Sequence, residues 1–119
     1  MDLRGLPAAL DVLATPAPGA MQLHHVQIVC HLAAYGSSGC TYAEIEERFG
    51  LSNASVSRCM NALSDSARHR ESALGLVEIF RDPREGRRYR CRLSKQGQAL
   101  MRSVAAIMNE GATTAAKAA

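Results

Sequence analysis

Aromatic residues are scarce in this sequence, at 4% with no tryptophan, so a hydrophobic core must be built mainly from aliphatic side chains. No apolar run approaches the roughly 18 residues that a membrane-spanning helix needs. The first residues, Met1–Arg4, lack the basic segment followed by an apolar block that marks an export signal. We therefore expect a soluble, cytoplasmic domain rather than a membrane protein.

The four cysteines are far apart and form no C-x-x-C pair; they are Cys30, Cys40, Cys59 and Cys91. A disulfide-stabilised miniprotein would carry a denser framework, and this spacing fits reduced thiols in a cytosolic protein. The chain has 119 residues, of which 47% are hydrophobic. That length and apolar content fit one compact domain.

Positive charge is concentrated in one short segment. Residues 81–95 contain seven basic and two acidic residues, a local balance of 7 − 2 = +5, whereas the whole chain has a net charge of +3. The rest of the chain therefore carries 3 − 5 = −2. A focused basic segment is typical of proteins that bind a polyanion. A solvated basic hairpin without a partner is the alternative.

The N-terminal part predicts two helices separated by a break. Residues 2–14 fit a short helix with Pro7 in its first turn, and the Pro- and Gly-containing segment 15–19 interrupts it. Helical spacing of apolar residues then predicts a helix over 21–35. Its expected apolar positions are Leu23, Val26, Cys30 and Ala33, with Ile28, Val29 and Leu32 beside them.

Two further helices flank a glycine. Thr41 and Glu44 form a capping-box pattern that begins a helix, and Gly50 suits its end. Ser52 or Asn53 can cap the next helix. Its expected apolar face is Val56, Cys59 or Met60, and Leu63, and its polar face is Ala54, Ser55, Ser57, Arg58 and Asn61. Residues 64–73 fit either extra turns of this helix or a loop.

After Gly75 the pattern changes to alternation. Residues 76–80 have strand composition, and residues 82–86 are rich in turn-forming Asp, Pro and Gly. In the next segment the apolar Tyr89, Cys91 and Leu93 alternate with Arg88, Arg90 and Arg92. This alternation predicts a β-hairpin with arginines on one face.

Ser94 can cap a last helix, which we expect to end at Gly111 and to be followed by a flexible, Ala-rich tail. The apolar stripe of this helix is Leu100, Val104, Ile107 and Met108. The expected organisation is a short helix and linker over 1–20, a central domain over 21–100, and the helix end with its tail over 101–119.

The two central helices form a helix-turn-helix pattern. Apolar residues that can hold them at an angle lie on both sides of Gly50, namely Ile45, Phe49, Leu51 and Val56. The second helix, at about 53–65, could enter a DNA major groove. Its short polar residues allow close approach to base edges and phosphates, and its positive N-terminal end attracts phosphate.

The chain resembles winged helix-turn-helix regulators of the MarR family. The matching segments are Leu23–Gln27, Gly50–Arg58, Gly75–Glu78, Asp82–Arg88 and Leu93–Gly97, which occur in the family's order. The resemblance implies a mainly α fold with a small β-hairpin, called the wing, over 81–92. It also implies a transcriptional regulator, expected to be a repressor, that binds a pseudo-palindromic DNA duplex as a homodimer through its terminal helices.

Three features depart from the family pattern. Glu46 stands where the family prefers a small residue, usually Ala. Eleven residues separate Leu63 from Gly75, where the family commonly has three or four, and this insertion could lengthen the second helix. The terminal helices are also short for a family-style dimer.

The residues that we expect to contact DNA are Ser52, Asn53, Ser55, Ser57, Arg58, Asn61, Arg84, Arg87, Arg88 and Arg90. Arg58 is the expected base reader because its guanidinium matches the O6/N7 edge of guanine. The alternative for Arg58 is an ion pair with Glu47 or Asp65. Arg84, Arg87 and Arg88, at the tip of the hairpin, are expected to contact phosphates or the minor groove. Backbone contact or solvent exposure is expected for Arg90, Arg92 and Lys95, and phosphate contact or ordinary surface exposure for Arg68 and Arg70.

Other functions fit the sequence less well. We expect no enzyme, metal or cofactor, because the four histidines do not combine with Cys or carboxylates at ligand spacing and no Gly-rich phosphate loop is present. A thiol sensor is an alternative, with Cys40 as the expected exposed thiol and Cys30 and Cys59 in the core. The stronger alternative is a winged-helix module that docks an acidic protein.

Overall fold

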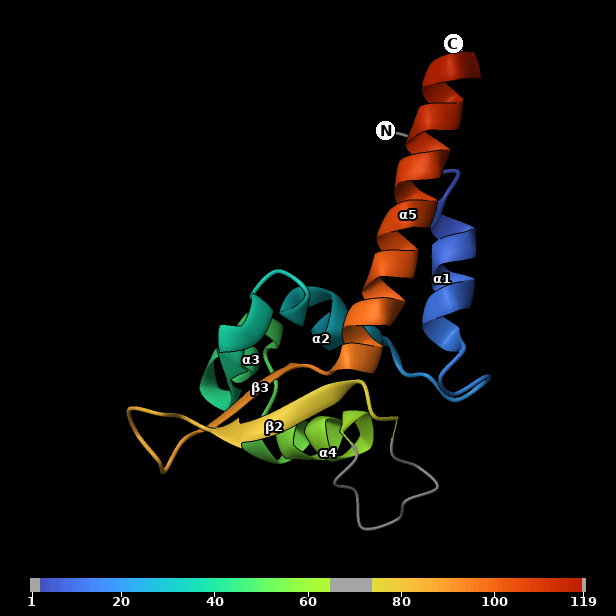
Figure 1. Ribbon diagram of the computed structural model, residues 1–119. Helices are drawn as coiled ribbons and strands as arrows, with labels where there is room; N and C mark the ends of the chain where they lie inside the picture. Colours follow the sequence, from blue (N-terminus) through green and yellow to red (C-terminus); the bar gives the residue numbers. More distant parts are fainter. Residues whose placement is uncertain (1–2, 65–73, 119) are drawn as a thin grey trace. The chain divides into compact units, whose positions relative to one another are not determined.

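The computed structural model describes residues 3–64 and 74–118. It is mainly helical with a small antiparallel sheet, which is the predicted class (Figure 1). The chain divides into two compact units, Gln22–Gln98 and the combination of Met1–Met21 with Ala99–Ala119. Within the described residues, no helix is both long enough and apolar enough to cross a membrane.

The unit formed by the chain ends contains α1 (Leu6–Ala14) and most of α5 (Lys95–Ala118). Helix α1 begins later than predicted because Pro7 occupies its first turn, where a missing N–H costs no hydrogen bond. Ala9 and Leu13 of α1 are buried, as is Val104 of α5. Gly5 lies against α5, since a Cβ added there would be 3.0 Å from the carbonyl oxygen of Ile107.

Helix α5 begins as predicted and ends later. The Ser94 hydroxyl accepts a hydrogen bond from the Gly97 N–H at 3.1 Å, which is the expected cap. The prediction that Gly111 ends this helix is wrong, because α5 continues to Ala118. One interior glycine costs about 1 kcal/mol relative to alanine, and the alanine-rich sequence around it favours the helix.

Helix α2 (Leu23–Leu32) buries a different face from the one predicted. Leu23 is 71% exposed, and Cys30 is also exposed. The buried face is His25, Ile28, Val29 and Leu32, which is itself an i, i+3, i+4, i+7 set. Two helical stripes fit this sequence equally well, and packing within the unit selects the one that contains a histidine.

The turn between α3 (Tyr42–Phe49) and α4 (Asn53–Leu63) follows the sequence signals. The Thr41 hydroxyl accepts from the Glu44 N–H at 3.1 Å, and Gly50 adopts φ 65° at the end of α3. That left-handed conformation suits glycine because it has no Cβ. The Ser52 hydroxyl then caps α4 by accepting from the Ser55 N–H at 3.1 Å.

Helix α4 ends at Leu63, so the insertion after it does not lengthen the helix. Its apolar face is as predicted, with Val56, Cys59, Met60 and Leu63 buried. The backbone of Ser64 is extended and forms a parallel bridge with Val77, and the Leu76 N–H donates to the Leu63 carbonyl at 2.7 Å. The end of α4 and the start of β2 are therefore neighbours, on either side of the insertion.

The predicted hairpin is present as β2 (Val77–Arg81) and β3 (Tyr89–Leu93). The sequence analysis missed a short third strand, β1 (Cys40–Thr41), which pairs with β3 to give the order β1-β3-β2. A 3₁₀ turn, η1 (Gly36–Ser38), precedes β1. Gly39 allows this pairing, because a Cβ there would lie 2.0 Å from the Cys91 carbonyl oxygen.

The prediction that Cys40 is an exposed thiol is wrong. Cys40 and Cys91 are register partners in β1 and β3, and both are fully buried. Burial raises the pKa of Cys40 to about 11 and that of Cys91 to about 12. Cys30, predicted to lie in the core, is exposed, whereas Cys59 is buried as predicted. A redox-sensing cysteine needs an accessible thiol with a lowered pKa, so Cys40 does not fit this role.

Candidate nucleic-acid interface

The outward face of α4 presents short polar groups and one arginine. Asn53, Arg58 and Asn61 are exposed, and Ser57 is half-buried, whereas the opposite face of the helix is in the core. The Arg58 guanidinium donates to the Ser55 hydroxyl at 3.3 Å, and that hydroxyl also accepts from Ser52. The side chain of Arg58 is thus held along the first turns of α4.

The alternative ion pair of Arg58 with Glu47 is not formed within the described part of the chain, whereas Asp65 lies outside it. Arg68 and Arg70 also lie outside the described residues. The predicted DNA contact of Arg58 therefore stays a prediction that its exposure and position support.

Between α4 and the hairpin lie two open hollows that share three residues, Tyr42, Asn53 and Tyr89. One hollow extends along α4 to Ser57 and Asn61. The other is lined by glutamates of α3 and by Arg87 and Arg88 of the hairpin. The polar face of α4 and the arginines of the hairpin therefore border one continuous surface.

The two tyrosines at the centre of this surface were missed by the sequence analysis. The rings of Tyr42 and Tyr89 lie 5.8 Å apart between centroids, so α3 and β3 meet there. Burial raises the pKa of Tyr42 to about 12, so its phenol stays protonated. Because Tyr42 starts a helix and Tyr89 follows an arginine-rich turn, no periodic signal links them in the sequence.

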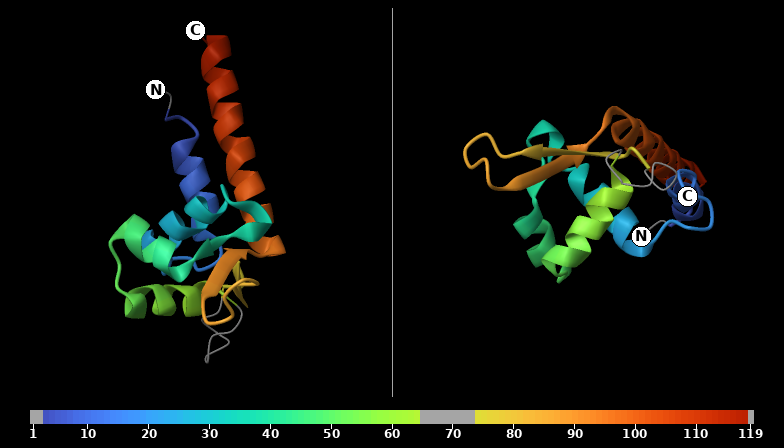
Figure 2. Two further views of the ribbon diagram at one scale, coloured as in Figure 1. Left: turned by 90° about the vertical axis from the view of Figure 1, so that its left-hand side faces the viewer. Right: turned by 90° about the horizontal axis from the view of Figure 1, so that it is seen from below.

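The turn of the hairpin is folded by one aspartate. Asp82 Oδ1 accepts from the backbone N–H groups of Arg84 at 2.8 Å and Glu85 at 3.2 Å. Its other oxygen accepts from Arg90 at 3.0 Å. These bonds, first of all the one from the Arg84 N–H, lower the pKa of Asp82. The turn projects beyond the helices of its unit (Figures 1 and 2).

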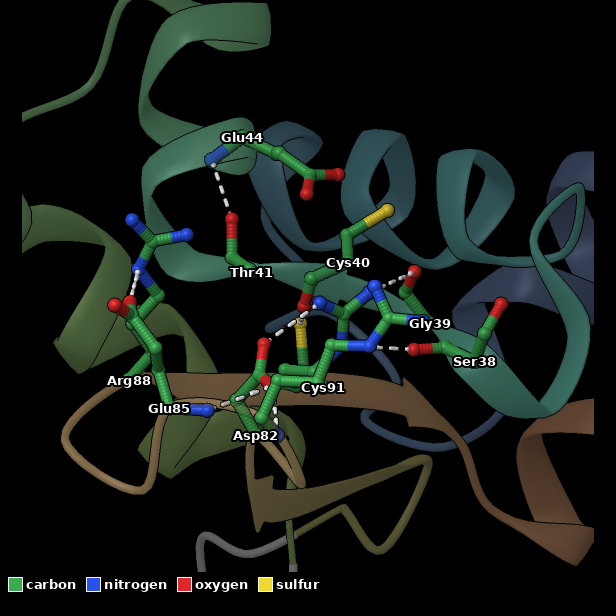
Figure 3. Close-up of polar contacts among 11 residues, drawn as sticks. Ser38, Gly39, Cys40, Thr41, Glu44, Asp82, Glu85, Arg88 and Cys91 are labelled. Carbon is green, nitrogen blue, oxygen red and sulfur yellow. Dashed lines mark hydrogen bonds and ion pairs between the residues drawn. The ribbon is translucent and has the colours of Figure 1, made fainter.

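Arg90 is tied into the protein rather than free to contact a ligand. Besides Asp82, its guanidinium donates to the carbonyl of Ser38 at 3.0 Å and that of Gly39 at 3.4 Å. Figure 3 shows these three partners gathered around one guanidinium. The side chain is only 21% exposed. Arg90 therefore joins the hairpin to η1, and we no longer place it among the groups that reach DNA.

Two other arginines of the segment are engaged in the same way. Arg92 pairs with Glu78 at 2.9 Å, donates to the Ser37 carbonyl and lies over the ring of Phe80. Arg81 donates to the Gly86 carbonyl at 2.7 Å and lies over the ring of Tyr89. Both therefore fix the shape of the hairpin.

The remaining arginines lie at the tip. Arg84 and Arg87 are exposed, and within residues 3–64 and 74–118 their guanidinium groups contact no acidic side chain. Arg88 pairs with Glu85 at 2.9 Å, but both side chains are 63% exposed, so the pair is weak and exchangeable (Figure 3). Of the arginines in residues 81–92, those available to a partner thus lie at the tip.

No protein-family model and no curated protein sequence matches the chain. Among solved structures, the MepR–DNA complex of S. aureus matches with TM-score 0.73 at 18% identity, over 94% of this chain and 82% of that one. MepR bound to ethidium bromide matches with TM-score 0.70 at 17% identity, over 97% and 74%. The PcaV transcriptional regulator from Streptomyces coelicolor, with its natural ligand, matches with TM-score 0.59 at 21% identity, over 93% and 72%.

These similarities cover nearly the whole chain. The fold is therefore the winged-helix fold of the MepR and PcaV structures. The architecture predicted from the motif order is thereby confirmed. In this winged-helix fold α3 and α4 are the helix-turn-helix, and β2, β3 and their turn are the wing. No group of three metal-ligating side chains occurs among the described residues.

Proposed function

We propose that this protein is a transcriptional regulator that binds double-stranded DNA in a sequence-specific manner. The observation that carries the proposal is that Asn53 of α4 and Arg87 and Arg88 of the wing line one hollow. A helix that reads a major groove and a wing that contacts the adjacent backbone must face the duplex together. The MepR–DNA complex, which has the same fold, supports this arrangement.

In this proposal the two parts of the surface have different tasks. Asn53, Ser57, Arg58 and Asn61 of α4 face base edges in the major groove, with Ser52 and Ser55 near the phosphates at the helix N-terminus. Arg84, Arg87 and Arg88 contact phosphates or the minor groove. Base contacts give specificity, and phosphate contacts give most of the affinity.

We further propose that two copies bind together, as a repressor in the cytoplasm. Exposed leucines at the N-terminus support an interface between copies: Leu6 and Leu10 of α1 are 38% and 48% exposed, and Leu3, which precedes this helix, is 55% exposed. Large apolar side chains that are exposed near one another are typical of interaction surfaces. A two-fold dimer binds two half-sites about one helical turn apart. The proposal requires no catalysis by this chain.

Selection of binding sites from random duplex DNA tests the function. We expect enrichment of an inverted repeat whose half-sites are centred about one helical turn apart. Polyglutamate serves as the competitor, because an acidic-protein docking module would release DNA equally readily to any polyanion. Retention of random DNA without enrichment, or displacement of the selected duplex by polyglutamate as readily as by the same duplex, would contradict the proposal.

A further inference from the structure

One contact joins the two helices of the helix-turn-helix on the proposed DNA-binding side. The side-chain amide nitrogen of Asn53, at the first position of α4, lies 3.5 Å from Glu46 Oε2 on α3. Asn53 is exposed, and Glu46 is half-buried. Both residues line the hollow that also contains Arg87 and Arg88.

The chemistry of the two groups determines which way the Asn53 amide is turned. A carboxylate only accepts hydrogen bonds, whereas a primary amide has an NH₂ donor on one side and an oxygen acceptor on the other. If the amide were turned by 180°, Oδ1 would face the Glu46 carboxylate and two acceptors would repel. The NH₂ group therefore faces Glu46, and Oδ1 faces away from it.

The position of Asn53 makes this orientation matter. Asn53 lines both hollows between the helices and the wing, so it lies between the glutamate-bordered region and the one formed with Ser57 and Asn61. The exocyclic amino groups of adenine and cytosine are donors in the major groove, whereas thymine O4 and guanine O6 are acceptors. An amide that presents its oxygen discriminates between these two pairs of bases.

We infer that Glu46 is a specificity-determining positioning residue, which holds Asn53 so that its Oδ1 accepts a hydrogen bond from an adenine or cytosine amino group. This inference rests on the proposed DNA-binding function. Glu46 does not itself touch the base. It selects between the two orientations that a free asparagine could adopt, and a free asparagine would serve acceptor and donor bases alike.

The test compares isosteric variants that each remove one negative charge. Glu46→Gln replaces the acceptor with an amide that both donates and accepts, so Asn53 can turn either way. Glu47→Gln is the matched control, since Glu47 lines the same hollow on the same helix and is exposed. Base preference is measured at every position of the selected duplex by competition with single-base-pair substitutions, and thermal unfolding verifies that both variants are folded.

At one position of each half-site, the wild-type protein should favour an amino-bearing base by about tenfold or more. In Glu46→Gln this ratio should fall below about threefold, while Glu47→Gln should keep the wild-type ratio. Asn53→Ala should abolish the preference, and adding Glu46→Gln to it should leave the base preference unchanged. Both glutamine variants should bind the duplex more tightly overall, because each removes a negative charge beside DNA.

Two results overturn the inference alone: an unchanged ratio in Glu46→Gln, or an equal change in both glutamine variants. The first would mean that the carboxylate does not orient the amide, and the second that only charge matters. Failure of the wild-type protein to enrich any duplex would overturn the proposed function and this inference with it. The two failures are therefore distinguishable in the same experiment.

Discussion

Replacement of Arg84 and Arg87 at the wing tip, which contact no acidic side chain within residues 3–64 and 74–118, should lower the salt dependence of DNA binding by a calculable amount. Each phosphate neutralised by a cationic side chain contributes about −0.9 to the slope of log K against log salt. If Arg84 and Arg87 each contact one phosphate, the double variant Arg84→Gln with Arg87→Gln should have a slope smaller by about 2 × 0.9 = 1.8 for each bound protomer. For each bound protomer, a fourfold rise in salt concentration should then weaken DNA binding by the variant about 12-fold less than DNA binding by the wild-type protein.

Fluorescence anisotropy with one selected duplex, measured between 50 and 200 mM salt, gives the slope directly. The control is Arg92→Gln, which removes one positive charge, half as many as the double variant, from a guanidinium already paired with Glu78. We expect its slope to equal that of the wild-type protein. The exposed tip variants should also unfold at the wild-type temperature, since surface substitutions of this kind usually change stability by less than about 0.5 kcal/mol.

Two outcomes would refute the reasoning. An unchanged slope in the double variant would show that the wing tip does not contact phosphates. A decrease of about 0.9 in the slope of the Arg92→Gln control, the amount expected for one charge, would show that the slope follows total charge rather than the particular arginines at the wing tip. In either case the assignment of the wing to the DNA backbone would fail.

Three further predictions test single contacts. Burial, followed by the charge of His24, lowers the pKa of His25 below its usual value of 6.5. The folded protein should therefore be most stable above pH 6.5 and lose stability as the pH falls below it, which urea unfolding at several pH values measures. The variant His25→Phe should lack this pH dependence. Gly39→Ala should lower the free energy of unfolding by about 2–4 kcal/mol, because Gly39 has φ +61° and the added Cβ would meet the Cys91 carbonyl. Gly50→Ala should lower it by only about 1–2 kcal/mol, because Gly50 has φ +65° but no other atom lies within 4 Å of the added Cβ. Glu85→Gln should raise DNA affinity about threefold by freeing Arg88, with little change in the unfolding temperature.

The parts of the fold that follow from local chemistry were predictable. The Thr41 cap, the left-handed Gly50 and the Ser52 cap each depend on residues within a few positions of one another, and all three occur as expected. The wing strands were predictable for the same reason, because alternation of side chains is a property of each strand alone. Local signals of this kind predict where helices and strands begin and end, but they do not predict which helices and strands are in contact.

The errors concern contacts between distant segments. The short β1 strand exists only because Cys40 and Thr41 pair with β3, about fifty positions away, and two residues carry no periodicity of their own. The same pairing buries the Cys40 thiol that looked exposed at a helix start. In α2 two apolar stripes were available, and the structure buries the one that contains His25.

The candidate site shows the same division between local and distant information. The exposure of the α4 face follows from helical periodicity, and it agrees with prediction at Asn53, Arg58 and Asn61. The central tyrosines and the contact of Glu46 with Asn53 depend on how α3, α4 and the wing meet. The departure of Glu46 from the family pattern was visible in the sequence, and its partner was not.

The partition of the arginines has a consequence for how affinity and specificity arise. The guanidinium groups of Arg81, Arg90 and Arg92 donate hydrogen bonds to backbone carbonyls, carboxylates and a tyrosine hydroxyl of the protein itself. The +5 charge of the segment is therefore larger than the charge available to contact a duplex. The glutamates of α3 reduce the positive potential further beside Asn53. Because only part of the charge of this segment is available to a duplex, its sequence-independent attraction should be weaker than the +5 balance implies. Discrimination among DNA sites then depends on the oriented polar groups of α4, where a single carboxylate decides which face of an amide a base encounters.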